Sequence, residues 1–270
     1  MWPTNPTELG IAQDRLTGLT PVPWRPGAGC RQVDGGDAAG PATSSPPDMA
    51  APLPSGPARP LPPDAAASSP PDPTWLDEVA LGACWTCFPR GLAGPGAAGD
   101  PAWTAAVVLR GSQVLDRQTL RGAAAAPYVP GLLALRLGAL MEPAVRSLAR
   151  RPEVLLVDAT ARDHPRRAGL ALMLGAQLDL PTIGITRRPL VATGHWPDDD
   201  DGATSPLRIG DEVVACWLRT RAGSRPVAVH PGWRVDLDTA VAVVAWTTER
   251  HRTPEPLRCA RQAARKARQG

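Results

Sequence analysis

The residues best suited to chemistry gather in one short stretch, VLLVDATARDHPRR at 154–167. Asp158 ends an apolar run, and a polar loop then carries His164, Arg166 and Arg167. A carboxylate can hold a hard cation such as Mg²⁺, an imidazole can move a proton, and guanidinium groups bind phosphate bidentately. The stretch is therefore suited to chemistry at a phosphate.

The apolar run before Asp158 has the composition of a central parallel strand with both faces covered. Ligands of open α/β sheets bind beyond the carboxyl ends of such strands, which is where Asp158 falls. A second interpretation stays open, because Asp also caps helices and a helix is predicted to follow from Arg167 to Leu178.

Composition divides the chain into four segments. Residues 1–19 hold a short helix, predicted over 4–18 with Thr7 as its cap, and residues 20–73 are mainly Pro, Gly, Ala, Ser and Asp. Such a segment buries too little apolar surface to offset its ordering entropy, so we predict a disordered insertion. Residues 74–258 then form one domain, followed by a basic tail over 259–270, a helix or a frayed end.

The sequence favours a cytoplasmic location without membrane contact. No apolar run reaches the roughly 18 residues that a membrane-spanning helix needs, and the N-terminus lacks the basic and apolar regions of a secretory signal. The five cysteines, an odd number, are typical of a reducing compartment. Cys84 and Cys87 form a C-x-x-C that suits a redox pair or half a zinc site, but positions three apart in a predicted strand face opposite sides, which favours a structural role.

The net charge is less informative about a partner than the kind of basic residue the chain uses. The net charge of +3 is too small to establish a nucleic-acid partner, and nearly every base is arginine, with Lys266 the only lysine. GC-rich codon usage explains the total, so only particular arginines are candidates for binding phosphate.

The order of predicted elements sets the fold class. In chain order they are strands over 78–89, 102–109 and 113–119, a helix over 132–148, the strand ending at Asp158, a helix over 167–178, strands over 182–186, 212–219 and 226–229, and a helix over 236–247. An antiparallel meander followed by alternating helices and strands predicts an α/β fold, a ribonuclease-H-like mixed sheet with helices on both faces. Four adjacent aspartates at 198–201 are expected to form a solvated loop, with cation binding as the alternative.

Several sequence runs together indicate a family. They are FPRG (88–91), PYVPGLL (127–133), VDATARDHPRRAGL (157–170), LDLPTIGIT (178–186), HPGWRVDLDTA (230–240) and RTPEPLRCA (252–260). In order and spacing they resemble endonuclease V, and ELxxxQxxL from Glu8 to Leu16 resembles that family's first helix. The resemblance covers residues 1–18 and 75–262. It implies a ribonuclease-H-like fold and hydrolysis, dependent on Mg²⁺ with Mn²⁺ as an alternative, of a phosphodiester near a deaminated base, chiefly inosine, in DNA or RNA. We expect a monomer whose partner is nucleic acid.

The resemblance also assigns a wedge and a base pocket. It implies that the PYVPG segment inserts beside the lesion and that the displaced base enters a pocket, where its edge can be read. The residues carried over by motif are Pro127, Tyr128, Val129, Pro130 and Gly131 for the wedge and adjoining wall, and Leu133, His164 and Gly169 for the rest of the pocket. Tyr128 is the only tyrosine of the chain, and a proline on either side restricts its backbone.

The chain departs from the family at positions that the resemblance makes catalytic. Trp85 stands where the family has its first Asp, Leu137 where it has Glu, and Trp233 where it has His; Arg187 replaces a Lys. Asp158 alone remains as a metal ligand, and one carboxylate does not reproduce the clamp that phosphoryl transfer requires. If cleavage survives, Asp158 holds the metal, His164 positions the phosphate or base, and Arg187 neutralises charge.

Other side chains are candidates to replace the lost groups. Glu142, Asp163, Asp236 and Glu78 are the acids near enough in sequence, and His230 is the candidate imidazole. Three functions therefore remain open: an inosine-directed endonuclease, a reader that binds deaminated nucleic acid without cutting it, and a scaffold that keeps the fold while another segment binds a protein.

Overall fold

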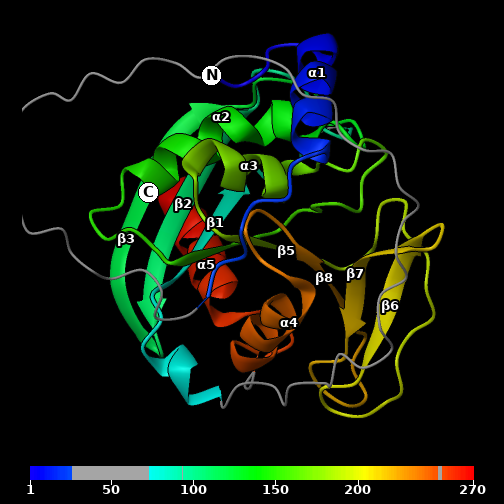
Figure 1. Cartoon of the computed structure of the whole chain (residues 1–270). Coiled ribbons are helices and arrows are strands. Elements are labelled where there is room, and N and C mark those ends of the chain that lie inside the picture. Colours follow the sequence, from blue (N-terminus) through cyan, green and yellow to red (C-terminus); the bar gives the residue numbers. More distant parts are fainter. Residues whose placement is uncertain (26–72, 93, 249–250) are drawn as a thin grey trace, which may run out of the picture.

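The computed structural model describes residues 1–25, 73–92, 94–248 and 251–270, and its centre is an eight-stranded mixed sheet (Figure 1). The strand order is β3-β2-β1-β4-β5-β8-β7-β6. The three central strands β1, β4 and β5 are parallel, and the outer strands pair antiparallel. The bounds are β1 (Leu81–Cys87), β2 (Pro101–Arg110), β3 (Gln113–Ala123), β4 (Val154–Val157), β5 (Thr182–Thr186), β6 (Thr204–Ile209), β7 (Glu212–Leu218) and β8 (Val227–Pro231).

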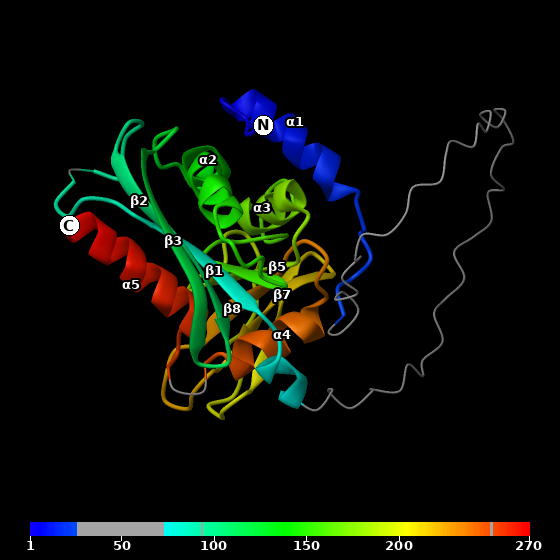
Figure 2. The same ribbon diagram turned by 90° about the vertical axis from the view of Figure 1, so that its left-hand side faces the viewer.

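Helices cover both faces of the sheet, as Figure 2 shows. One core joins β1, β2 and β4 to α2 and α3, with α1 outside them, and a second core joins the other face to α4 and α5. The helices are α1 (Pro6–Thr17), α2 (Leu133–Arg146), α3 (Leu170–Leu178), α4 (Leu237–Trp246) and α5 (Glu255–Gln269), and a 3₁₀ turn, η1, spans Pro73–Asp77. The predicted ribonuclease-H-like α/β fold is confirmed.

Strand β4 has the sequence VLLV and is buried at every position, because both cores enclose it. Its carboxyl end, followed by Asp158, opens between the two helix layers. The sheet therefore delivers Asp158 to the edge where ligands of such sheets bind.

The N-cap of helix α1 lies two residues before the predicted one. Asn5, not Thr7, is the N-cap, and its side-chain oxygen accepts the Glu8 N–H at 2.9 Å. Asn is among the strongest N-cap residues, and Pro6 fits the first helical position because its missing N–H would have no partner there.

Two other elements differ from prediction. Helix α3 begins at Leu170 rather than Arg167, because Arg167 has a φ of 55°, in the left-handed region. Strand β6 was not predicted; it is an edge strand that contains Pro206, a residue tolerated at sheet edges but uninformative for a strand assignment.

Two of the predicted segments contain residues that are packed into the domain. Residues 26–72 of the predicted insertion lie outside the described residues, but Trp24 is buried in the second core and donates its N–H to Arg234 O at 2.6 Å. At the other end, α5 runs through the proposed boundary between 258 and 259. Its small residues Ala260, Ala263 and Ala264 are buried against the sheet, which makes α5 part of the packed domain.

Cys84 and Cys87 point into different cores, as strand geometry predicts. Burial raises the pKa of the Cys84 thiol to about 12, and the Cys87 thiol donates to Ala264 O at 3.3 Å. Both are packing residues. Among the helices that the structure describes, none has the length and apolar character to cross a membrane.

Candidate functional site

Asp158 lies between two hollows at the carboxyl ends of β4 and β5. The larger has a volume of about 270 Å³ and the smaller about 30 Å³. Strands β1 and β4 pair up to Cys84 and Val157, so the residues that follow these two, Trp85 and Asp158, lie next to each other. Gly169, not Asp158, caps the following helix, so the capping interpretation is wrong.

The Asp158 carboxyl is open to water at the mouth of both hollows but has protein on most sides. The reduced hydration raises its pKa to about 6, and the positive charges of Arg187 and Arg261 act in the opposite direction. No hydrogen bond joins this carboxyl to a residue that the structure describes.

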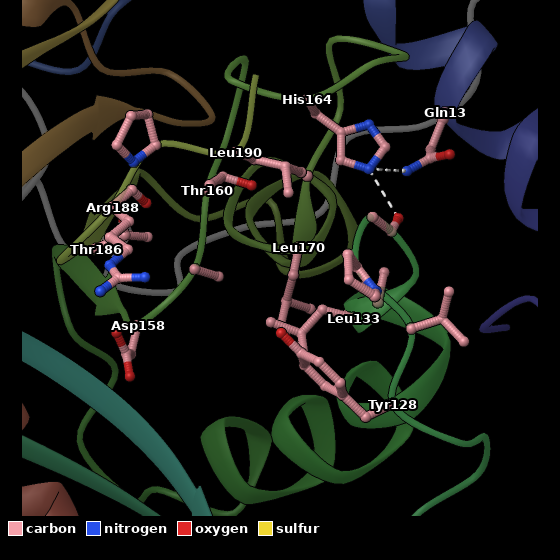
Figure 3. Close-up of a pocket in the computed structure, with 17 residues that line it drawn as sticks. Gln13, Tyr128, Leu133, Asp158, Thr160, His164, Leu170, Thr186, Arg188 and Leu190 are labelled. Atoms are coloured by element: carbon pink, nitrogen blue, oxygen red, sulfur yellow. Dashed lines mark hydrogen bonds between the residues drawn. The ribbon is translucent and has the colours of Figure 1, made fainter. Parts of the chain in front are cut away.

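The larger hollow is enclosed by the segments that the motifs singled out, as Figure 3 shows. Tyr128 and Val129 stand at its mouth with 45% and 40% of their surface exposed. Its lining residues are Gln13, Tyr128, Val129, Pro130, Gly131, Leu133, Ala134, Asp158, Ala159, Thr160, His164, Gly169, Leu170, Thr186, Arg188, Pro189 and Leu190. Apolar walls with a few polar groups are the usual character of a ligand pocket.

His164 joins the PYVPG segment (127–131) to the loop after β4. The Arg166 N–H donates to His164 Nδ1 at 3.1 Å, so the ring proton is on Nε2, which donates to Gly131 O at 2.8 Å. Burial lowers the pKa of His164, and its hydrogen bond to Gly131 only partly opposes this. A neutral imidazole with both nitrogens engaged holds the PYVPG segment (127–131) against the loop after β4.

Gly131 and Gly169 are required by the backbone around this imidazole. Gly131 has a φ of 80°, which side chains rarely adopt. A Cβ on Gly169 would lie 2.4 Å from Thr160 O. Gly131 therefore permits the turn that ends the PYVPG segment, and Gly169 lets the loop after β4 fold closely back on itself at Thr160.

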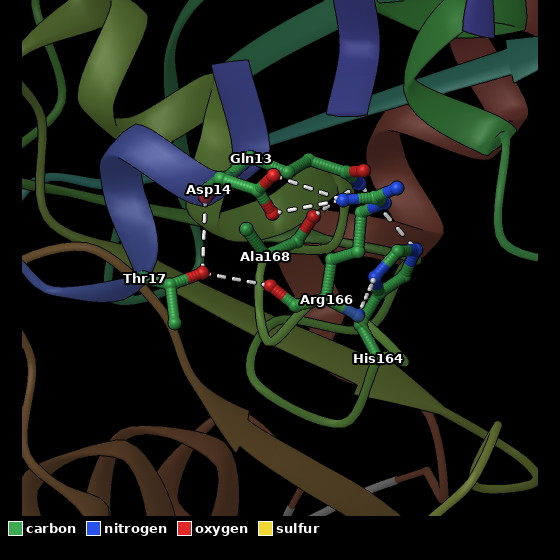
Figure 4. Close-up of polar contacts among 6 residues, drawn as sticks. All are labelled: Gln13, Asp14, Thr17, His164, Arg166 and Ala168. Atoms are coloured by element: carbon green, nitrogen blue, oxygen red, sulfur yellow. Dashed lines mark hydrogen bonds and ion pairs between the residues drawn. The ribbon is translucent and has the colours of Figure 1, made fainter. Parts of the chain in front are cut away.

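Helix α1 clamps the loop that carries His164 (Figure 4). The buried Gln13 amide donates to Ala168 O at 2.7 Å, and Arg166 forms two contacts of 2.9 Å with Asp14. Thr17 Oγ1 lies 2.8 Å from Arg166 O. Three side chains of one helix thus fix one wall of the larger hollow.

The smaller hollow has a different lining. It is bounded by Trp85, Asp158, Ile185, Thr186, Arg187, Val227, Arg252, Thr253, Leu257 and Arg261. The Arg261 guanidinium lies over the Trp85 ring, 5.8 Å from its centroid, in a cation–π contact. Around Asp158, guanidinium groups and an indole occupy the place where the resemblance predicts carboxylates.

The residues at Asp158 do not fit a Mg²⁺ ion. No group of three or more His, Cys, Asp or Glu side chains able to hold a metal exists in the part of the chain that the structure describes. Leu137 is buried in the core beneath α2, and Trp85 packs against the second core. Mg²⁺ requires several oxygen ligands in near-octahedral geometry, and Asp158 alone supplies at most two.

The candidate replacement acids are engaged elsewhere. Glu142 accepts from the Trp2 indole and from Arg146, and Asp236 caps α4. Glu78 precedes β1, at the end of that strand opposite to the site.

Asp163 and His230 are buried close to the site but not available to it. Asp163 accepts the N–H groups of Leu190, Val191 and Ala192, which shapes the loop lining the larger hollow. His230 Nε2 lies 2.8 Å from Thr186 Oγ1, and burial lowers its pKa to about 4. These hydrogen bonds are inconsistent with the rewired metal centre that the sequence left open.

Trp233 lies away from Asp158. Its N–H donates to Thr182 Oγ1 and its indole to Asp179, at the start of β5. The site is at the other end of β5, beyond Thr186. Because β8 runs antiparallel to β5, the turn after β8 reaches the opposite edge of the sheet.

Sequence reasoning missed Gln13, Arg188 and Leu190 in the larger hollow and Arg252 and Arg261 in the smaller one. Arg261 belongs to a set of arginines at helical spacing, 258, 261, 265 and 268, in the predicted basic tail, which suits contact with phosphate but is also common in a solvated terminus. The spacing alone did not indicate which of them reaches the sheet edge.

Comparisons with known proteins agree with these motifs. A family model described as Endonuclease V matches residues 95–262. Endonuclease V of Roseiflexus castenholzii is 42% identical over 167 residues, covering 61% of this chain and 75% of that protein. The structure of endonuclease V from Streptomyces avermitilis is 34% identical, covers 72% of this chain and 82% of that one, and superposes with a TM-score of 0.65.

A further structure establishes only the shared fold. Endonuclease V of Ciona intestinalis, solved with DNA containing an inosine followed by a ribo-adenosine, is 21% identical, covers 71% of this chain and 86% of that one, and gives a TM-score of 0.58. The family model spans more than half of the sequence, and the motifs that it covers enclose the larger hollow. This chain belongs to the endonuclease V family.

Proposed function

We propose that this protein binds inosine-containing nucleic acid and reads the displaced base in the larger hollow, without cutting the strand by metal-dependent hydrolysis. One observation carries the proposal: a hollow enclosed by the family motifs adjoins a centre with a single carboxylate. Base recognition and metal binding are thereby separated in this chain.

The base-reading half of the proposal is supported by the rigidity of the wedge segment. Tyr128 stands exposed between Pro127 and Pro130, and its N–H donates to Gly96 O at 3.0 Å. His164 holds the segment's other end through Gly131. A stiff aromatic wedge suits the extrusion of a base, which costs least when that base is mispaired.

The loss of cleavage follows from electrostatics. Phosphodiester hydrolysis in this family is expected to rely on Mg²⁺ or Mn²⁺ held by several carboxylates, which position the phosphate and neutralise developing charge. Asp158 lacks partners for that task, His164 is neutral and engaged at both nitrogens, and Arg187 offers hydrogen-bond donors but no metal ligand. In the proposed reader, His164 positions the wedge and Arg187 neutralises charge on the strand.

Location and oligomeric state belong to the same proposal. We place a monomer in the cytoplasm, supported by the thiols of Cys84, Cys87, Cys216 and Cys259, which are free in the structure.

The test compares the Tyr128→Ala variant with the unmodified protein on matched strands. DNA and RNA strands carrying inosine, or adenosine at the same position, are titrated by fluorescence anisotropy. Loss of the wedge should lower inosine affinity about tenfold, on the scale of one lost base-stacking contact, while adenosine affinity changes by less than about threefold. Leu120→Ala, which truncates an exposed side chain on the outer strand β3, is the control.

An equal loss on inosine and adenosine strands would remove the wedge assignment. Absence of binding to either strand by the unmodified protein would favour the scaffold function instead.

A further inference from the structure

Three arginines from distant segments converge on the smaller hollow. Arg187 follows β5, Arg252 precedes α5, and Arg261 lies on α5 itself. Together these three residues form the arginine cluster. Arg187 and Arg261 take part in no ion pair with any residue that the structure describes, whereas Arg166, Arg219 and Arg258 each pair with a carboxylate.

The positive charges of the arginine cluster repel one another. Burial lowers the pKa of Arg252 and of Arg261, and in both cases the nearby charge of Arg187 lowers it further. Only Asp158 among the lining residues carries a compensating charge. Three cations and one carboxylate leave the hollow positive.

Arg252 also has an unmet hydrogen-bonding group. One of its terminal nitrogens donates to Pro226 O at 3.0 Å, but its Nε is buried without a partner among the described residues. Buried donors are nearly always paired, so this residue, which lines the hollow, keeps a hydrogen-bonding group that no described residue satisfies.

The contact of Arg261 with Trp85 does not use the hydrogen-bonding groups of the guanidinium. The Trp85 ring supports the Arg261 guanidinium from one side, which leaves its N–H edges directed elsewhere. The hollow, about 30 Å³, has room for about two water-sized groups, too few for a base but enough for phosphate oxygens. It shares Asp158 with the larger hollow, so an anion here would sit beside a base bound there.

We propose that the arginine cluster binds a phosphate of the nucleic-acid strand directly, through Arg187, Arg252 and Arg261, with no bridging metal ion. The inference rests on the proposed reading of a displaced base and adds how the neighbouring phosphate is held. Guanidinium groups suit this task because their planar forks donate two parallel hydrogen bonds to phosphate and are weakly hydrated.

The test uses the full chain in buffer containing EDTA. Affinities for the inosine and adenosine strands are measured for Arg261→Gln and for Arg258→Gln, the control. Arg258 lies on the same helix but pairs with Glu255 and lines a separate hollow, so both variants remove one charge from α5. Arg261→Gln should weaken both strands about tenfold and reduce the slope of log affinity against log salt by about 0.7, the value for one phosphate contact on a single strand.

A chemical change in the strand locates the contact. One uncharged methylphosphonate linkage is placed next to the inosine. It should weaken binding by the unmodified protein at least about tenfold and weaken binding by Arg261→Gln clearly less, because the variant has already lost one of the three guanidinium contacts to that phosphate. Thermal unfolding of both variants confirms that each is folded.

The outcomes separate this inference from the proposed function. Equal effects of Arg261→Gln and Arg258→Gln, or strand binding that requires Mg²⁺, would overturn the phosphate site and leave base reading intact. Binding that depends on Arg261 but does not distinguish inosine from adenosine would overturn base reading and keep the phosphate site.

Discussion

The charged neighbours of Asp158 are arginines, whereas a metal centre would place further carboxylates beside it. A Mg²⁺ site gathers carboxylates around a cation, whereas here Arg187 and Arg261 bring cations to one carboxylate. Arginines and a bound Mg²⁺ would repel each other, so the cluster and the ion exclude one another at this position. The same arrangement attracts a phosphate.

His230 is a second residue whose environment decides its protonation. The Thr186 hydroxyl donates to Arg188 O, so it accepts from His230 Nε2–H, and Nδ1 is left without a proton or a partner among the described residues. Burial lowers the pKa of His230 to about 4, against the opposing charge of Asp163.

Stability should therefore fall in mild acid because of His230. Between pH 6.5, the ordinary His value, and pH 4, the unfolded chain binds a proton that the folded chain does not, so the free energy of unfolding decreases as the pH falls. The loss attributable to His230 is about 3 kcal/mol at most. Urea unfolding at pH 7 and pH 5 should give a smaller difference for His230→Gln than for the unmodified protein, with His195→Gln as the exposed control. Identical differences in His230→Gln and the unmodified protein would contradict this account.

At the scale of elements, α1 serves as a clamp for the loop that carries His164. Its contacts differ in burial: the Gln13 amide is buried against Ala168 O, whereas Asp14 and Arg166 pair with 63% and 52% of their side chains exposed. Burial decides which contact matters, since exposed ion pairs contribute little.

We expect Gln13→Ala to cost about 1–3 kcal/mol of stability, because it leaves a buried carbonyl unpaired, and to reduce the preference for inosine by loosening His164. Asp14→Ala, one residue along the same helix, should cost less than about 1 kcal/mol and keep the preference. Urea unfolding and the paired strand titration measure both quantities. A larger effect from Asp14→Ala than from Gln13→Ala would show that the surface pair, not the buried amide, holds the loop.

The elements were predictable where a local pattern specifies them. The VLLV strand is apolar because both faces are covered, and α2 follows the PYVPG segment as expected. Strand β6 was missed although it forms a hairpin with the next strand, β7, because it contains Pro206, which counts against a strand assignment. Trp24 was missed because its position depends on a backbone hydrogen bond to Arg234, far along the chain. Such a contact leaves no periodicity to read.

At the scale of the whole molecule, the sheet presents two adjacent hollows at one edge. The motifs predicted the larger one, because Tyr128, Gly131 and His164 lie in short runs whose spacing carries the resemblance. The smaller one depends on the crossing of α5 over β1, which brings Arg261 to Trp85, and the sequence alone did not specify that crossing.

Trp233 was predicted to lie at the site, and the structure places it elsewhere. The resemblance placed it among the catalytic positions, but the antiparallel course of β8 carries it to the far end of β5. A family motif specifies a residue's order along the chain, and only the sheet topology specifies the edge at which that residue emerges.

The central claim is that base reading persists here without a metal-dependent cut. The most direct measurement follows binding and cleavage of the same inosine-containing DNA and RNA strands in Mg²⁺, in Mn²⁺ and in EDTA. We predict inosine-selective binding of similar affinity in all three conditions and intact strands throughout, because arginines hold the phosphate. Cleavage beside inosine that appears with Mg²⁺ or Mn²⁺ and disappears in EDTA would contradict the account.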